Sequence, residues 1–322
     1  RGLAHYKIIF LSAGTGWAKT ATVKKLLEKQ NPTHLSLRKK SLPNYFSKER
    51  LIVLDDFHEL PSQAEEQFQE ILRKSQRGQH FVLISRGPLP GYLSLYEATG
   101  ALLQLGSDDL ALDMECLSQL AQARGLSFST DGFQRLQDET GGCPVAVNIL
   151  LLMLSAGQPF QKPTIDAMRG KVGAYINETT LRLLDPKAQK LLTELSLFGE
   201  FDQKLAEMLT GDKTILSTLE ALRHTSGLIQ REGDVWRIDD QRFLIPYLRQ
   251  KLLAEYPEEH IRSVHLAGGR WYALKQDFRN ALYHYQQADS REDIMDALAQ
   301  NARHHPGVGA YYEMRDYYNL LT

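Results

Sequence analysis

A glycine-containing turn between a strand pattern and a helix pattern constrains the fold of this chain more than any other feature. The apolar run from Tyr6 to Leu11 has the length and character of a fully buried parallel strand. The turn from Ser12 to Thr20 follows, and Ala21 to Lys29 favours a helix. Such a turn aims backbone N–H groups and a helix N-terminus at a bound anion. The sequence therefore predicts a phosphate-binding loop after the first strand of a parallel sheet.

The residues that close this turn, Lys19 and Thr20, are the types that a nucleotide requires. A lysine reaches the terminal phosphates and a hydroxyl holds Mg²⁺, so the expected ligands are ATP or ADP with Mg²⁺. For Trp17 two interpretations stay open, since it either lies over the nucleotide or simply packs. Nucleotide contacts are predicted for Gly14, Thr15, Gly16, Trp17, Ala18, Lys19, Thr20 and Ala21, with Thr20 also at the metal.

Ala18 departs from the usual phosphate-loop pattern, which has glycine before the lysine. If this position requires a left-handed backbone, the Cβ of alanine costs about 1–2 kcal/mol. The alternative interpretation of the turn is an ordinary strand–helix connection with an accidental Lys-Thr pair.

Two further strand patterns end in charged residues. Leu51 to Leu54 leads into Asp55 and Asp56, and Phe81 to Ile84 is followed closely by Arg86. The carboxyl ends of parallel strands face one crevice, where ligands bind in open α/β sheets. We predict that Asp55 holds the metal and Asp56 activates the attacking water, with the reverse assignment also open. Arg86 either senses the terminal phosphate or is an exposed loop residue.

The order of the patterns predicts an α/β fold followed by helical modules. With short strands at 34–37 and 102–105, strands alternate with helices up to residue 106, which indicates a doubly wound parallel sheet. Helical periodicity then dominates, with a linker expected at 158–163. Three short helices before a hairpin turn at Gly233 describe a winged helix, and the last segment is like the start of a helical-repeat array. The expected modules are a P-loop nucleotide-binding domain at 1–106, a helical lid at 107–163, a winged helix at 164–257 and the first repeats at 258–322.

Composition excludes several classes of protein. The 322 residues are 43% hydrophobic and 24% charged with a net charge of -1, which is typical of a globular domain and lacks the electrostatic footprint of a general nucleic-acid binder. The two cysteines form no CxxC pair, which argues against a disulfide scaffold or a zinc site and favours a reducing cytosol. No apolar run is long enough to span a bilayer, so no membrane partner is expected. Because the chain starts at Arg1 and stops inside a helical pattern, we expect a piece of a longer protein.

Taken in order, the motifs resemble the STAND signal-transduction ATPases, and among these the large LuxR-family transcription regulators. The segments that carry the resemblance are GTGWAKT, LIVLDDFHEL, FVLISR and ETGGCPVAVNILL, followed by the winged-helix and repeat patterns. The resemblance implies a bacterial cytoplasmic regulator with at most slow ATPase activity. In such proteins ATP and a small-molecule or protein effector favour an open, self-associating state. DNA contact would come only from a C-terminal domain outside these residues.

The resemblance repeats the roles given above to the loop, the two acids and Arg86, and it adds Pro144 beside the adenine. Two departures stand out. The family usually has a histidine just after the wing, whereas residues 239–243 contain none, and the span between the first helix and the LIVLDD strand is short. Together with Ala18, the missing histidine leaves a second interpretation open, a degenerate non-hydrolysing scaffold that binds proteins through its helical repeats. A third interpretation, a DNA-remodelling ATPase whose winged helix reads DNA, is disfavoured by the near-neutral net charge and by the acidic pair Asp239 and Asp240.

Overall fold

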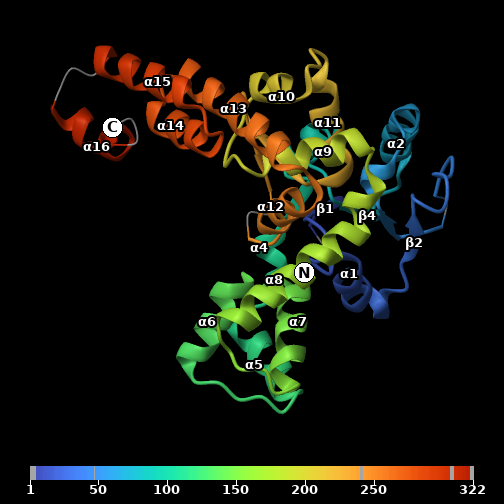
Figure 1. Ribbon diagram of the computed structural model, residues 1–322. Coiled ribbons are helices and arrows are strands. Elements are labelled where there is room, and N and C mark those ends of the chain that lie inside the picture. Colours follow the sequence, from blue (N-terminus) through green and yellow to red (C-terminus); the bar gives the residue numbers. More distant parts are fainter. Residues whose placement is uncertain (1–4, 47, 240–241, 305–307, 320–322) are drawn as a thin grey trace. The chain divides into compact units, whose positions relative to one another are not determined.

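The computed structural model describes residues 5–46, 48–239, 242–304 and 308–319 (Figure 1). The chain divides into two compact units. The first comprises residues 1–183, 220–230 and 239–244, and the second comprises residues 184–219, 231–238 and 245–322. These units do not coincide with the four expected modules, whose boundaries remain predictions.

A five-stranded parallel sheet forms the centre of the first unit, with the strand order β2-β3-β4-β1-β5. Each strand falls on a run that the sequence predicts as a strand, and the expected α/β class is confirmed. The strands are β1 (Ile8–Ser12), β2 (Thr33–Ser36), β3 (Leu51–Asp55), β4 (His80–Ser85) and β5 (Leu102–Leu105).

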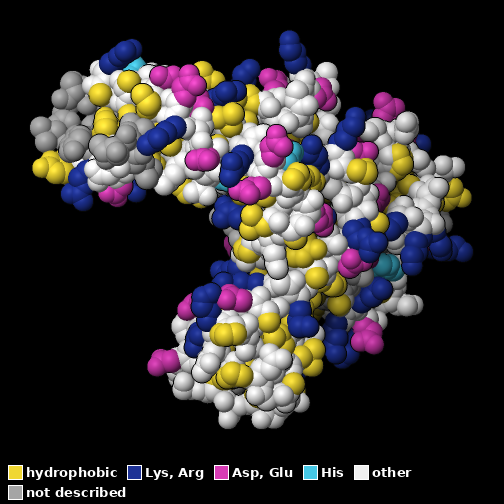
Figure 2. Space-filling model, viewed as in Figure 1, with side chains coloured by type: hydrophobic (Ala, Val, Ile, Leu, Met, Phe, Trp, Pro, Cys, Tyr) yellow, Lys and Arg dark blue, Asp and Glu magenta, His cyan; other side chains and the backbone are white. Residues whose placement is uncertain are grey.

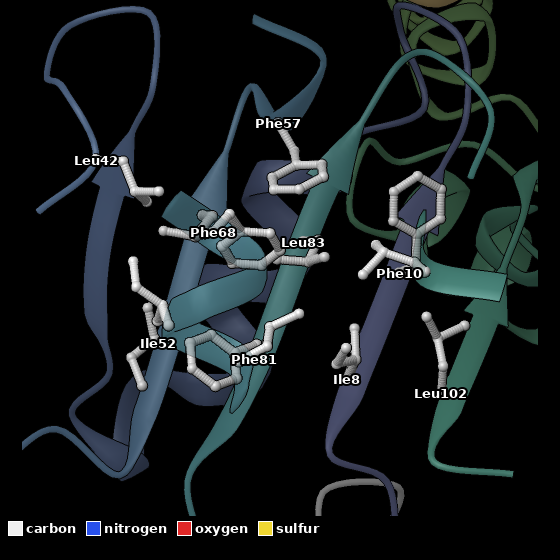
Figure 3. Packing of buried hydrophobic residues seen from close by; sticks show 13 residues of the cluster. Ile8, Phe10, Leu42, Ile52, Phe57, Phe68, Phe81, Leu83 and Leu102 are labelled. Atoms are coloured by element: carbon white, nitrogen blue, oxygen red, sulfur yellow. The ribbon is translucent and has the colours of Figure 1, made fainter. Parts of the chain in front are cut away.

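Alternating side chains of the strands supply two hydrophobic cores, one on each face of the sheet. On one face, Phe10 and Phe81 pack with Phe68 of helix α2 (Ser62–Lys74) (Figure 3). On the other face, the strands pack against Val23 and Leu27 of helix α1 (Lys19–Leu27). Because both faces are covered, the central strands are apolar along nearly their whole length, and all of β3 is buried.

Helices complete the first unit, and α7 packs along α8. Helix α8 begins within the segment that was expected to be a linker, so the linker prediction for its last two residues is wrong. The physical reason is that Pro163 lies in the first turn of α8, where a missing N–H costs nothing and the fixed φ favours a helix. Besides α1 and α2, the helices in residues 1–183 of the first unit are α3 (Ser94–Ala98), α4 (Ser107–Leu110), α5 (Met114–Gln122), α6 (Thr130–Thr140), α7 (Pro144–Ser155) and α8 (Lys162–Thr179). Short 3-10 turns lie at Glu28–Gln30, Phe57–Glu59, Gly91–Leu93 and Leu181–Leu183.

Three helices followed by a hairpin come next, in the order that the sequence predicts. They are α9 (Pro186–Leu195), α10 (Gln203–Thr210) and α11 (Ile215–Ser226), then β6 (Ile229–Glu232) and β7 (Val235–Ile238). Gly233 has φ +61 in the hairpin turn, a left-handed conformation that glycine adopts without strain. In the second unit, Trp236 of β7 is buried and exchanges both backbone hydrogen bonds with Phe201.

The C-terminal part is entirely helical among the described residues. Helices α13 and α14 form an antiparallel pair, and Gly269 of α13 allows their close approach, since a Cβ there would lie 2.5 Å from the ring of Tyr285. The C-terminal helices are α12 (Leu244–Glu255), α13 (Glu258–Leu274), α14 (Phe278–Gln287), α15 (Arg291–His304) and α16 (Val308–Asn319).

On the face of the molecule shown in Figure 2, Lys and Arg side chains are interspersed with Asp and Glu side chains.

Among the described residues, no helix combines the length and the apolar character needed to cross a membrane.

Candidate functional site

A cavity of about 680 Å³ in the first unit lies where β1, β3 and β4 end. Gly14 and Trp17 are not among the described residues that line it. A Cβ on Gly14 would lie 3.7 Å from the indole of Trp17, so this side chain lies against the turn. The predicted site residues that line the cavity together are Thr15, Gly16, Ala18, Lys19, Thr20, Ala21, Asp55, Asp56, Arg86 and Pro144.

The loop after β1 has a left-handed backbone at two positions. Gly16 has φ +95, and a Cβ there would lie 2.6 Å from Val145, so both backbone and space require glycine. Ala18 has φ 52 and ψ 22, the left-handed conformation in which a Cβ costs about 1–2 kcal/mol. No side chain of the described residues caps the N-terminus of α1. The first N–H groups of α1 are therefore available to an anion.

Lys19 is held inside the turn by neutral oxygens. Its Nζ donates to the carbonyl of Ala13 at 2.6 Å and to that of Gly14 at 2.8 Å. Burial, assisted by the nearby charge of Arg86, lowers the pKa of Lys19 to about 8. A bound anion would favour the ammonium form and raise this pKa again.

Thr20 and Asp55 form an oxygen pair at the end of β3. The Thr20 hydroxyl donates to Asp55 Oδ1 at 3.1 Å, and the backbone N–H of Asp56 donates to the same oxygen at 3.0 Å. Asp55 is buried. One carboxylate and one hydroxyl fit the way Mg²⁺ is held in nucleotide sites, where phosphates and water complete the coordination. Within the described part of the chain, no group of three or more His, Cys, Asp or Glu side chains is placed to hold a metal ion by itself.

The side chain of Asp56 is hydrogen-bonded to the edge strand β2. Its backbone is left-handed with φ 56, and Ser36 donates a hydrogen bond to its Oδ2 at 2.9 Å. Arg38 Nη2 lies 3.9 Å from the other carboxylate oxygen and 3.0 Å from Glu59. Sequence reasoning missed Ser36 and Arg38, because only the parallel register, which places Ser36 beside Asp55, brings them to the acid.

His58 is a third residue that the sequence motifs did not single out, although it lies in the LDDFHEL segment. The backbone N–H of Arg86 donates to its Nδ1 at 3.3 Å, so the neutral ring carries its proton on Nε2. Burial, and next the charge of Arg86, lowers the pKa of His58 to about 3. The buried Nε2 has no hydrogen-bond partner among the described residues, and His58 lines the cavity. A carboxylate oxygen of Glu59 lies 3.8 Å from this Nε2.

Arg86 lines the cavity, as the first of its two interpretations requires. Its Nη1 donates to Thr180 Oγ1 at 2.9 Å and to the carbonyl of Thr179 at 3.3 Å. Burial is the main cause that lowers the pKa of this guanidinium. Both oxygens are neutral and lie at the C-terminal end of α8, on its last residue and on the residue after it, a place for which the sequence predicts no functional role.

The opposite wall of the cavity comes from α7 and α8. Pro144 and Val145 begin α7, and the N–H of Val145 donates to the carbonyl of Gly16 at 3.3 Å, which ties this helix to the loop. Tyr175 and Leu183 add an aromatic and an aliphatic surface. Pro144 thus lies in the same cavity as the loop.

The stretch that lacks the expected histidine is described only in part, since Asp240 and Gln241 lie outside the described residues. Asp239 is described, and its carboxylate lies 4.0 Å from the position of a Cβ on Gly14. An acidic side chain therefore faces the phosphate loop at this point.

The strand order, the loop after β1 and the two acids at the end of β3 define a P-loop NTPase fold. A Walker-type ATPase of Pyrococcus abyssi has a similar fold, with a TM-score of 0.52 and 14% identity over 77% of this chain and 92% of that chain. A STAND protein with a tetratricopeptide repeat sensor from Pyrococcus horikoshii matches 99% of this chain and 51% of its own, with 14% identity and a TM-score of 0.37. No family model matches the chain.

In sequence, the chain is similar to the HTH-type transcriptional regulator MalT of Yersinia pestis. The two are 28% identical over 266 residues, which cover 78% of this chain. The predicted resemblance to the large LuxR-family regulators is confirmed by this relative. The matched region spans only 28% of the length of that regulator.

Proposed function

We propose that this chain is the nucleotide-dependent switch module of a transcription regulator. It binds ATP or ADP with Mg²⁺ in the cavity of the first unit. The observation that carries the proposal is the convergence of Lys19, the Thr20–Asp55 pair and Arg86 on one cavity beside an uncapped helix N-terminus.

In this proposal, cationic and N–H groups bind the phosphates, and oxygen groups bind the metal and the water. The loop N–H groups and Lys19 bind the phosphates, and Thr20 with Asp55 holds Mg²⁺, which when bound neutralises phosphate charge. Asp56, kept in place by Ser36, orients a water and accepts its proton. Arg86 binds the terminal phosphate. Turnover by this set is slow, because Asp56 shares its carboxylate with Ser36 and Arg38.

Nucleotide state is passed to the segment after α10, which we propose is part of a winged helix. Arg86 and Gly87 contact the end of α11 within the first unit, so a movement of Arg86 toward a phosphate disturbs that contact. As in the related regulators that the motifs resemble, we propose that ATP and an effector favour an open, self-associating state in the cytoplasm. DNA binding is left to another domain.

Nucleotide binding tests the proposal directly. The purified chain is expected to carry ADP or ATP, or to take up either with Mg²⁺ in calorimetry and gain thermal stability. Lys19→Ala should weaken binding at least about tenfold, because a charge-assisted bond to phosphate is lost. Lys25→Ala is the matched control, since Lys25 is exposed on the same helix. No bound nucleotide and no thermal shift with Mg-ATP or Mg-ADP would contradict the proposal.

A binding module without turnover is the alternative, and the strained Ala18 favours it. The two differ in one measurement on nucleotide-loaded protein. Phosphate release that Asp56→Asn abolishes supports an ATPase, whereas bound ATP that persists unchanged supports a scaffold.

A further inference from the structure

We infer that Thr180 competes with the terminal phosphate for Arg86 and thereby sets how strongly the site prefers ATP over ADP. The inference rests on the proposed function, because it concerns the same cavity. Thr180 would act as a positioning residue, through Arg86, rather than on the nucleotide itself.

One buried hydroxyl links the two sides of the site. Thr180 follows the last residue of α8 and is 2% exposed. Its Oγ1 lies 2.9 Å from Arg86 Nη1 and 2.7 Å from Thr15 Oγ1 in the phosphate loop. A hydroxyl has one proton and two acceptor lone pairs, so it can accept from Arg86 while donating to Thr15.

The partners that Nη1 of Arg86 has here are weaker than a phosphate. Thr180 Oγ1 and the Thr179 carbonyl are both neutral, whereas a phosphate group is charged and can accept two parallel N–H···O bonds from a guanidinium through two of its oxygens. An exchange of Thr180 for an anion therefore stabilises the half-buried Arg86. The exchange also breaks the Arg86–Thr180 hydrogen bond, and this loss lowers the affinity of any ligand whose binding requires it.

ATP and ADP differ in this respect. ATP brings the terminal phosphate that recruits Arg86, so its binding must break the Arg86–Thr180 bond. ADP lacks that phosphate and leaves the bond intact. Both nucleotides meet the same phosphate loop, so any effect through Thr15 is common to the two and cancels in the ratio of their dissociation constants.

The test is Thr180→Val, which removes the hydroxyl and keeps the branched shape. The measured quantity is the ratio of the dissociation constant for Mg-ADP to that for a non-hydrolysable β,γ-imido ATP analogue with Mg²⁺, determined by calorimetry. We expect this ratio to rise about 3- to 10-fold, as the loss of one hydrogen bond implies. Thr180→Ser, which keeps the hydroxyl, should restore the wild-type ratio.

Thr179→Val is the matched control. Its hydroxyl bonds the carbonyl of Tyr175 inside the same helix, and Arg86 reaches only the main-chain oxygen of Thr179, which the substitution leaves in place. The ratio should not change. In an Arg86→Gln background, Thr180→Val should also leave the ratio unchanged, because the guanidinium for which Thr180 and the phosphate compete is then absent.

The outcomes separate the inference from the proposed function. A wild-type protein that binds neither nucleotide overturns both. Nucleotide binding with an unchanged ratio in Thr180→Val, or a change that persists in the Arg86→Gln background, overturns only the inference. If valine prevents folding, Thr180→Ala removes the same hydroxyl without a branched side chain, and the same ratio decides.

Discussion

Gly87 and His224 lie so close together that a Cβ on Gly87 would stand 2.1 Å from the carbonyl oxygen of His224. The contact is reciprocal, since a Cβ on Gly227 would stand 2.1 Å from the carbonyl oxygen of Arg86. Two glycines thus let the loop after β4 and the end of α11 meet backbone to backbone. This contact places α11 next to the residue that we propose binds the terminal phosphate.

Gly227→Ala should therefore loosen the end of α11 from the β4 loop. A methyl group has no room there, and the φ of +63 adds strain, so we expect a loss of about 1–3 kcal/mol in the free energy of unfolding. Denaturant unfolding measures it. Gly91→Ala is the control, because no neighbouring atom of the described residues lies within 4 Å of its Cβ position. Equal stability of the two variants would contradict the close contact.

Ala18→Gly should stabilise the chain. Ala18 is left-handed at the start of α1, and removing its Cβ relieves about 1–2 kcal/mol. The same change at Ala167, an exposed interior position of α8, should destabilise by about 1 kcal/mol. Thermal unfolding of both variants checks the opposite signs. A lower melting temperature for Ala18→Gly would show that the loop does not carry this strain.

Nucleotide affinity should fall as the pH rises through about 8, where free Lys19 loses its proton. Because the folded pKa lies below the ordinary value of 10.5, the folded state binds fewer protons than the unfolded state between pH 8 and 10.5. Stability therefore gains from this group as the pH rises, while phosphate binding weakens. Calorimetry with Mg-ADP at pH 7 and pH 9 measures the affinity. Lys19→Arg keeps the charge, and a pH dependence that survives in it would exclude Lys19 as the cause.

Removal of Mg²⁺ should have the same effect on nucleotide binding as Asp55→Asn. In the wild type, EDTA is expected to weaken ADP binding about 10- to 100-fold, the range for a lost interaction with a charged group. Asp55→Asn should bind ADP weakly with or without Mg²⁺. Asp56→Asn is the comparison, and we expect it to retain the metal dependence. If instead Asp56→Asn abolishes this dependence and Asp55→Asn keeps it, the two roles are reversed.

Acid should destabilise the second unit through His265 and His284. Their Nδ1 atoms lie 3.0 Å apart, and burial lowers the pKa values to about 4 and about 3. Both values lie below the ordinary 6.5, so stability is lost as the pH falls below 6.5. For His284 the loss at pH 5 is about 2 kcal/mol. His284→Asn should show a smaller drop in melting temperature between pH 7 and pH 5 than the wild type, and an equal drop would exclude this pair.

The local patterns predict the sheet well, because each strand carries its signal within itself. Runs such as Leu51 to Leu54 are apolar on both faces, which only a strand covered on two sides requires. The phosphate loop is equally local, since the turn, Lys19 and Thr20 are neighbours in the chain. By contrast, the linker prediction for residues 162 and 163 is wrong. Proline is common both after the end of a helix and in the first turn of the next one, and the sequence around Pro163 does not distinguish these two positions.

The sequence alone determined the parallel sheet, the loop after its first strand and the charged residues that end the next strands, because these depend on residues close together in the chain. Only the tertiary structure decided which side chains surround those charges. Ser36 meets Asp56 through strand register, and His58 meets the backbone of Arg86 across two neighbouring strand ends. Thr180 meets Arg86 from 94 residues away. Such contacts depend on how helices and strands pack, so neither the hydrophobic periodicity nor a local motif around any of these residues predicts them.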